Sequence, residues 1–247
     1  MKLTLLCALL WCGAASANGL DDMRAALAQL TGQAPLRGAY EVQETKNDLE
    51  SKTAKGPQTT LASAMVYDDA NGLEVRWERG LLKRAADEAS PARGANRKDA
   101  LSNMITQVSA TKLAAVMNYA PRLLQTLTWS QFRSERNDSY QGKPARLVEV
   151  GITPQEVPND NVSIKDNTLV AQFWIGPDGM PLAASTVHSI KAKFMVFISY
   201  EKTTKEEFTF SVVNNRLVVL KRESQGKEKG PGSDTEFRNV YTFTPKG

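Results

Sequence analysis

The spacing of hydrophobic residues changes several times along this chain, and each spacing predicts a different element. Near the start, apolar residues recur every three or four positions, as on one face of a helix: Leu20, Met23, Leu27 and Leu30. Gly32 follows the last of them, where a helix commonly ends. The pattern predicts a short amphipathic helix before the first strand.

Apolar and polar residues then alternate, which is the period of a strand with one buried face. The alternation predicts strands over 36–43, 61–67 and 73–81. Asp69-Ala70-Asn71-Gly72 links the second of these to the third, and Asn-Gly is favoured in tight hairpin turns. We therefore expect an antiparallel hairpin here.

A helical spacing returns over 82–127 and predicts two or three short helices. One apolar stripe covers 101–108, behind a candidate N-cap at Asn96. A second covers 113–120, and Pro121 is expected to stop that helix. We expect these helices to fill the concave side of the sheet, as core or as a movable lid.

The second half of the chain has the pattern of a long antiparallel meander. Strands are predicted, in order, over 128–136, 145–152, 168–175, 182–200, 206–213, 216–222 and 235–244. The connections are a loop over 137–144, a tight turn over 176–179, a two-residue turn at Asn214-Asn215, and a flexible loop over 226–233. The sequence thus predicts a mainly β (α+β) fold: a large curved antiparallel sheet, or half-open barrel, with an N-terminal helix and a helical insertion at about 82–127 covering one face.

The first 17 residues have the three parts of a secretory signal peptide. Lys2 supplies the positive charge, 3–11 the short apolar core, and 15–17 the small-residue cleavage pattern Ala-Ser-Ala. Cleavage after residue 17 would leave one periplasmic domain over 18–247. The apolar core is shorter than the 20 or so residues of a membrane span, and no later segment comes close; we expect no transmembrane segment.

Both cysteines of the chain, Cys7 and Cys12, lie inside this signal. Lipid attachment at Cys12 would need a small residue before it, whereas Trp11 is large. A domain without cysteine cannot contain disulfides, so an ordinary hydrophobic core must hold it together.

The chemistry-bearing residues exclude several classes of site. His188 is the only histidine, and both cysteines lie in the predicted signal. Zinc sites built from several His or Cys ligands and thiol chemistry are therefore excluded, and no cofactor or metal is expected. His188 shares its strand parity with apolar residues; it is either a neutral, hydrogen-bonded core histidine or a ligand contact. Asn159-Asp160-Asn161 with Asp166 lacks the calcium-hand spacing. No catalytic motif is present, and we expect no enzyme.

The charges are mixed along the chain. The formal charge is +4, and loss of Lys2 with the signal would leave +3. Without a dense basic run, nucleic acid is not an expected partner. Several basic residues near the last strands form either a solvated face or a contact for anionic lipid headgroups or an acidic protein: Lys191, Lys193, Lys202, Lys205, Lys221 and Arg222.

The layout resembles that of the LolA/LolB-type envelope carriers and the related RseB-type sensor domain. The similarity lies in a first strand beginning Leu36-Arg37-Gly38-Ala39-Tyr40, a helical insertion, the Gly-Pro-Asp-Gly turn at 176–179, and a last strand ending Tyr241-Thr242-Phe243-Thr244-Pro245. The resemblance implies a half-open antiparallel barrel around helices that plug a hydrophobic cavity.

These observations leave three functional hypotheses. The first is an envelope protein that binds a lipid, a lipoprotein acyl chain or another hydrophobic ligand through residues on the inner face: Tyr40, Trp77, Met104, Met117, Phe173, His188, Phe194, Phe208 and Phe210. The same residues would equally form a filled core. The second is a structural or interaction protein of the envelope that binds a protein partner and no small molecule. The third, an enzyme using carboxylates, has no motif behind it.

Overall fold

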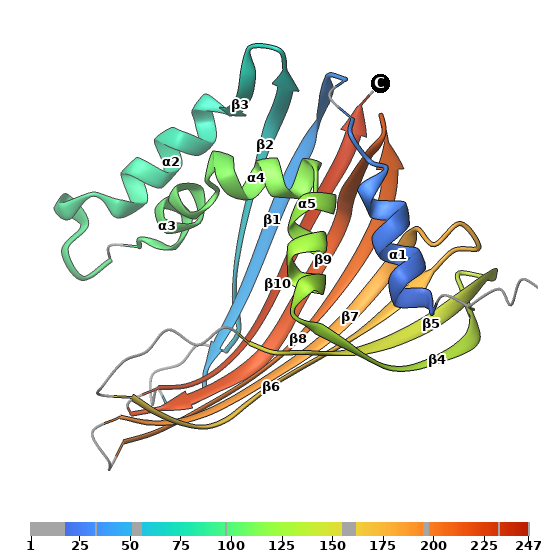
Figure 1. Cartoon of the computed structure of the whole chain (residues 1–247). Helices are drawn as coiled ribbons and strands as arrows, with labels where there is room; N and C mark the ends of the chain where they lie inside the picture. The colour runs from blue at the N-terminus through green and yellow to red at the C-terminus, as the bar shows by residue number, and fades with distance from the viewer. Residues whose placement is uncertain are drawn as a thin grey trace, which may run out of the picture.

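A computed structural model describes residues 18–32, 34–50, 56–96, 98–154, 162–194, 198–231 and 233–246. Ten strands form one antiparallel sheet that does not close, and the helices lie on one side of it (Figure 1). The mainly β fold class predicted from the sequence is confirmed.

The helices, in chain order, are α1 (Gly19–Ala28), α2 (Arg79–Ala89), the 3-10 helix η1 (Pro91–Asn96), α3 (Ala100–Gln107), α4 (Ala110–Met117) and α5 (Ala120–Thr128). The strands are β1 (Leu36–Asp48), β2 (Gln58–Asp69), β3 (Gly72–Trp77), β4 (Ser130–Tyr140), β5 (Lys143–Ile152), β6 (Val162–Ile175), β7 (Pro181–Phe194), β8 (Ile198–Val213), β9 (Arg216–Gly230) and β10 (Ser233–Lys246).

The strand order is β3-β2-β1-β10-β9-β8-β7-β6-β5-β4. Consecutive strands therefore pair with each other except β3 and β4, and β10 pairs with β1, which joins the two ends of the chain inside the sheet. The short strand β3 and the strand β4 lie at the two edges.

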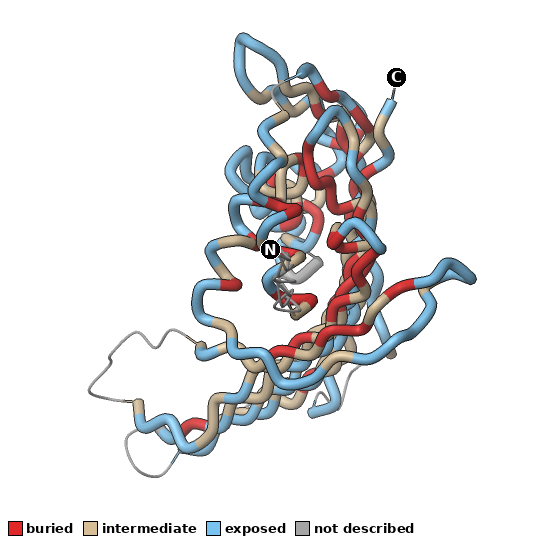
Figure 2. Tube along the Cα trace, turned by 45° about the vertical axis from the view of Figure 1, so that its right-hand side comes forward, coloured by how far each residue is buried: buried red, intermediate tan, exposed pale blue. Residues whose placement is uncertain are grey.

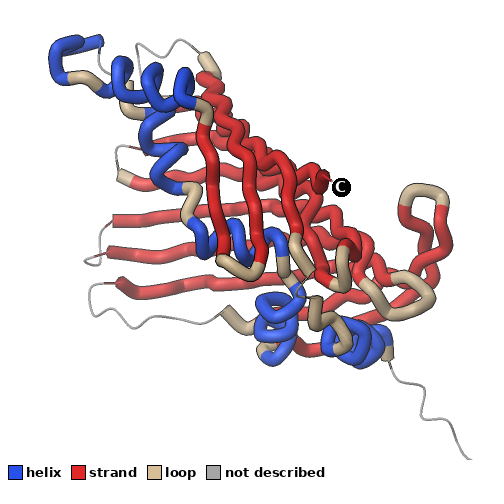
Figure 3. Tube along the Cα trace, turned by 90° about the horizontal axis from the view of Figure 1, so that it is seen from above, coloured by secondary structure: helices blue, strands red, loops and turns tan. Residues whose placement is uncertain are grey.

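The helices cover only part of the inner face. Helix α1 packs on α5 and β5, α4 on β9 and β3, and α3 on β2. In Figure 1, α1, α4 and α5 lie in front of the upper part of the sheet, α2 and α3 lie beside its β2–β3 edge, and the lower ends of the long strands β6–β10 extend past the helices. Figure 3 shows the same arrangement from above. The helices thus cover one part of the sheet and leave the rest of it uncovered.

Two groups of buried side chains hold the helices to the sheet. One joins α1 and α5 to β5–β9 and includes Leu27, Leu127 and Phe173. The other joins α2, α3 and α4 to β1, β2 and β10 and includes Met117 and Phe243. Figure 2 shows most buried positions gathered where the helices meet the sheet, whereas the far strand ends are mostly intermediate or exposed.

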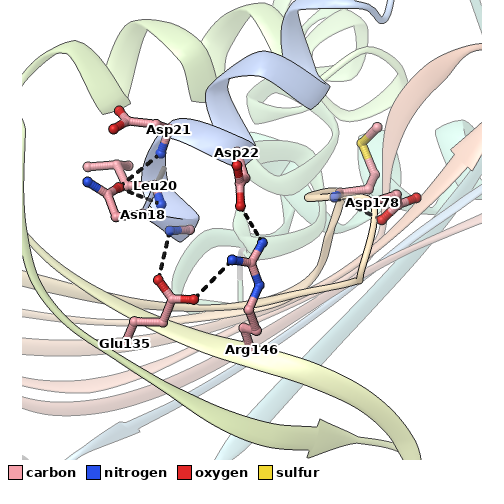
Figure 4. Close-up of polar contacts among 9 residues, drawn as sticks. Asn18, Leu20, Asp21, Asp22, Glu135, Arg146 and Asp178 are labelled. Carbon is pink, nitrogen blue, oxygen red and sulfur yellow. Dashed lines mark hydrogen bonds and ion pairs between the residues drawn. The ribbon is translucent and has the colours of Figure 1, made fainter. Parts of the chain in front are cut away.

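A polar network fixes the N-terminal end of α1 on strands β4 and β5 (Figure 4). Asn18 caps the helix: its side-chain oxygen accepts hydrogen bonds from the backbone N–H groups of the second and third residues after it. Arg146 on β5 donates to Asp22 at 2.6 Å and to Glu135 at 3.0 Å. The other oxygen of Glu135 accepts from the backbone N–H of Gly19 at 2.7 Å. The predicted helix over 20–30 is therefore confirmed, and its cap is a residue that the sequence reasoning had overlooked.

The strand predicted over 73–81 is too long. β3 ends at Trp77, and Arg79 and Leu81 belong to α2. Leu81 and Ala85 are the buried residues of that helix, one turn apart. Leu81 fits both the alternation of the strand and the four-residue spacing of the helix. Periodicity alone therefore did not show where the strand ends and the helix begins.

The helical insertion contains more helices than expected. Four α-helices and η1 occupy the segment where two or three helices were predicted. Asn96 ends η1 and does not cap α3, whose N-cap position is Asp99. Pro121 does not stop a helix; it lies in the first turn of α5, where its missing N–H costs no hydrogen bond.

Three segments predicted as loops belong wholly or partly to strands. β4 and β5 continue through 137–144 and leave only the two-residue turn Gln141–Gly142, and Asp166 lies within β6. Most of the loop predicted over 226–233 is paired with neighbouring strands. Polar residues extend these strands because both sheet faces are solvated beyond the helices. Residues 159–161 lie outside the described residues.

The single strand predicted over 182–200 is two strands. β7 ends at Phe194 and β8 begins at Ile198, and these two residues pair with each other in an antiparallel register. The predicted hairpin at Asn214-Asn215 is confirmed; both residues have positive φ, which suits a tight hairpin turn.

Candidate functional site

The junction of α4 and α5 brings an aromatic cluster to the inner face of the sheet. Tyr119 lies between the two helices, and its backbone N–H donates to the carbonyl of Leu217 on β9 at 2.7 Å. Its ring stacks on Phe208 and Phe210 of β8, with centroids 6.0 and 5.7 Å away. Tyr119 thus fixes the helical cover to the centre of the sheet.

Two cavities lie on either side of this cluster. The larger, of about 520 Å³, faces β6–β10 and α5, and the smaller, of about 380 Å³, lies between β1 and helices α3 and α4. Both are within the range of small-ligand sites, about 300–1,000 Å³. Six residues line both cavities: Tyr119, Arg122, Glu206, Phe208, Arg222 and Tyr241. We call this shared set the collar.

A broader hollow of about 1170 Å³ lies outside the helices. It shares Arg122, Thr126, Ile152 and Leu169 with the larger cavity. Arg122 is exposed and lines all three spaces. The hollow is therefore a route by which the larger cavity meets solvent.

An arginine in the middle of the collar is the most prominent polar group of the site. Arg222 forms an ion pair with Glu206, and its guanidinium lies 5.7 and 5.6 Å from the ring centroids of Phe208 and Tyr241. Burial lowers the pKa of Arg222, but Glu206, Tyr241 and Tyr119 together raise it by more, so the side chain stays charged. Its Nε is buried and has no hydrogen-bond partner among the described residues.

The collar also supplies phenol groups. Burial raises the pKa of both Tyr119 and Tyr241. In the smaller cavity, burial and the neighbouring Tyr241 raise the pKa of Tyr40. These hydroxyl groups therefore stay protonated at neutral pH, and each is able to donate one hydrogen bond.

A second ion pair lies at the wall of the larger cavity that β8 contributes. Lys202 on β8 donates to Glu228 on β9 at 2.9 Å, and its ammonium lies 5.4 Å from the ring centroid of Phe237. Gly226 makes room for that ring, because a Cβ there would lie 2.9 Å from the Phe237 ring and 2.2 Å from a backbone oxygen of β8. This glycine is required by the close packing of strand and ring.

His188 lies on the wall of the larger cavity. Its Nε2 is 2.9 Å from the side-chain oxygen of Asn167 on β6. Burial lowers the pKa of His188, Lys202 lowers it further, and Glu206 opposes both. The histidine is therefore neutral near pH 7 and available as a hydrogen-bonding group.

The structure places the nine predicted ligand-contact residues in different environments. Phe173, His188, Phe208 and Phe210 line the larger cavity; Tyr40, Met104 and Phe208 line the smaller one. Met117 is fully buried in the core and Trp77 packs partly buried on β3. Phe194 ends β7, and its side chain lies outside the described part of the structure.

Sequence reasoning missed most of the collar. Tyr119, Arg122, Glu206 and Tyr241 were not singled out as ligand contacts. Arg222 and Lys202 were predicted to lie either on a solvated face or at a contact for anionic lipid headgroups or an acidic protein. Both basic residues line a cavity. For Lys202 the sequence contained a signal: like His188 it has an even number, so alternation along the strands places both side chains on the same face. For Arg222 the sequence contained no such signal.

Among the described residues, no group of three or more His, Cys, Asp or Glu side chains is arranged to hold a metal ion. Within the same part of the chain, no helix has the length and apolar character needed to cross a membrane.

Comparison with known proteins gives weak similarities. No family model matches the chain, and no curated protein matches it. Among solved structures, the chain is similar to a DUF1329 family protein from Desulfovibrio piger, at 12% identity and a TM-score of 0.34, with 92% of this chain and 90% of that chain covered. It is also similar to MucB in complex with MucA(peri), at 9% identity and a TM-score of 0.20, with 91% and 94% covered. Neither similarity is strong enough to assign a function.

Proposed function

We propose that this is an exported envelope protein that binds a hydrophobic ligand, such as a lipid or a lipoprotein acyl chain, between the inner face of its sheet and its helices. The proposal includes the signal peptide over 1–17 and a periplasmic location. It assigns binding and no catalytic step.

One observation is central to this proposal: two cavities of about 520 and 380 Å³ flank the cluster of Tyr119, Phe208 and Phe210. A filled core would leave few voids larger than a water molecule. Aromatic walls with a few convergent polar groups are typical of small-molecule sites. These cavities therefore favour a ligand site over a filled core.

A second candidate function rests on the edge strand β4. Most of its residues are exposed, and it lies at the end of the sheet, where the outer backbone groups have no neighbouring strand. Phe132 on this strand and the adjacent Trp129 are 40% and 51% exposed. An envelope protein that adds a strand here would use backbone hydrogen bonds and these two side chains.

The test uses N-phenyl-1-naphthylamine, an uncharged fluorescent probe of apolar sites, with purified residues 18–247. We expect saturable fluorescence enhancement with one class of site, and native mass spectrometry of the protein as purified should show a bound lipid that organic extraction removes. A protein that neither enhances the probe nor carries or takes up lipid would overturn the proposal and favour strand addition at β4.

A matched pair of variants locates the binding. Thr204 lines the larger cavity, and its neighbour Thr203 is exposed on the opposite face of β8. Thr204→Trp should fill the cavity and weaken probe binding by roughly tenfold, which corresponds to a clash of about 1–2 kcal/mol. Thr203→Trp should leave it unchanged. Equal effects of the two substitutions would place the probe elsewhere.

A further inference from the structure

The side chains that line the two cavities carry an excess of positive charge. Four are basic and two are acidic: Arg122, Arg222, Lys112 and Lys202 against Glu44 and Glu206. Burial raises the pKa of Glu44, with Lys112 opposing, so this carboxylate is less readily ionised than a free glutamate side chain. Arg122 and Lys112 are exposed and Lys202 is paired with Glu228, so the cation that is costly to desolvate is Arg222, and a site meant only for hydrocarbon does not need it on its wall.

The positive charge is concentrated at the collar. Arg222 faces both cavities and is paired there with Glu206, while its buried Nε has no acceptor in the part of the chain that the structure describes. Arg122 lies exposed where both cavities meet the outer hollow. The two arginines are therefore positioned at the point where a ligand entering from solvent would leave its polar end.

We propose that the ligand is an anionic amphiphile, whose carboxylate or phosphate group binds Arg222 and Arg122 at the collar and whose apolar chain occupies an adjoining cavity. This inference rests on the proposed function and specifies its ligand class. Arginine suits the role because its planar group stays charged and binds carboxylate and phosphate oxygens in a bidentate manner.

The chemistry of the collar distinguishes this ligand from a neutral one. An anionic group would supply the acceptor that Nε lacks and would balance the excess charge in a region of low dielectric constant. The hydroxyl groups of Tyr119 and Tyr241 would donate to the same anion. A neutral amphiphile of equal chain length would gain the apolar contacts alone.

The test compares two fluorescent ligands with the same 18-carbon tail: cis-parinaric acid, which is a carboxylate at pH 8, and its uncharged methyl ester. Wild-type protein should bind the acid roughly tenfold or more tightly than the ester, as expected for one charge-assisted interaction. Higher salt should reduce that ratio. Inorganic phosphate alone should fail to displace the acid, because it has no apolar chain.

The variants assign the preference to the collar. Arg222→Gln should weaken acid binding more than ester binding, so that the ratio of the two affinities falls toward one. Because that change leaves Glu206 unpaired, the double variant Arg222→Gln/Glu206→Gln and the exposed variant Arg122→Gln are tested beside it. Lys205→Gln is the control, since Lys205 lies on the opposite face of β8 and pairs with Glu207 there.

The outcomes separate the two proposals. Probe binding with equal affinity for acid and ester, unaffected by Arg222→Gln and Arg122→Gln, would overturn the anionic class and leave the hydrophobic site standing. Loss of the acid preference in Lys205→Gln as well would assign it to general surface charge and also overturn the inference. Absence of binding by the uncharged probe and by both parinaric ligands would overturn the proposed function itself.

Discussion

Replacing Arg146 tests how α1 is held on the sheet, because this one side chain contacts both the helix and strand β4. Its guanidinium donates to Asp22 on α1 and to Glu135 on β4, and Glu135 in turn accepts from the backbone N–H of Gly19 (Figure 4). Arg146→Gln removes both ion pairs. It leaves two carboxylates close to each other without the charge that balanced them.

The expected loss follows from the distances and the exposure. The two N–O distances are 2.6 and 3.0 Å, and the three side chains are 27%, 35% and 23% exposed for Arg146, Asp22 and Glu135. Exposed pairs contribute about 0.2–1 kcal/mol, and hydrogen bonds to charged groups about 1.5–3 kcal/mol. Because these side chains are of intermediate exposure, each ion pair should contribute about 1 kcal/mol to stability. The free energy of unfolding should therefore fall by about 1–3 kcal/mol. For a chain of this size that is roughly 3–10 °C in Tm.

The assay is urea unfolding followed by circular dichroism, with Arg136→Gln as the control. Arg136 is exposed on β4, beside Glu135. A double-mutant cycle with Asp22→Asn isolates the pair, and the coupling energy should shrink at high salt. If Arg146→Gln and Arg136→Gln unfold at the same urea concentration, or if the coupling energy is zero, the network does not stabilise α1.

Three further changes test other parts of the fold. Met117 is fully buried, so Met117→Ala should lower the free energy of unfolding by about 2–5 kcal/mol in urea titration, whereas the 45% exposed Val212, changed to Ala, should cost under about 0.5 kcal/mol; equal losses would contradict the assigned core. Gly226→Ala should destabilise by at least about 1–3 kcal/mol, because the new Cβ would lie 2.2 Å from the carbonyl oxygen of Thr203, and a wild-type Tm would argue against this close packing. Burial lowers the pKa of His188 in the folded state below its usual 6.5, so the unfolded chain binds the proton more readily and stability should fall as pH drops below about 6.5. His188→Gln should flatten the pH dependence of Tm in that range, and an unchanged slope would refute this origin.

The sequence predicted the sheet well because its signals are local. Alternation of apolar and polar residues and two-residue turns such as Asn214-Asn215 identify strands and hairpins without knowledge of the rest of the fold. Besides the strand ends at Trp77 and Phe194, the errors lie in 137–144 and 226–233, where composition favours loops. In 226–233 the strand continues because it pairs with a neighbouring strand on each side, and in 137–144 the two strands continue because they pair with each other up to a two-residue turn. Pairing between distant segments, which a local pattern does not contain, decides the outcome.

The candidate site was less predictable, and Arg222 shows why. On β9, Val219 faces the smaller cavity, so strict alternation would place Lys221 inside and Arg222 outside. The pairing of β8 with β9 shifts between Thr209 and Phe210, which pair with Lys221 and Val219. Leu220 is thus an extra residue, and this bulge returns Arg222 to the inner face opposite Phe208.

The bulge also connects the fold to the proposed ligand. Without the extra residue, a flexible lysine would face the cavities in place of an arginine that pairs with Glu206 and lies over two aromatic rings. Arginine holds its donors in a fixed plane, whereas lysine presents a single hydrated charge. A bulge re-aims side chains at the cost of one unpaired residue. Its position beside the collar is therefore the feature of the backbone that most directly favours an anion-binding centre between the two cavities.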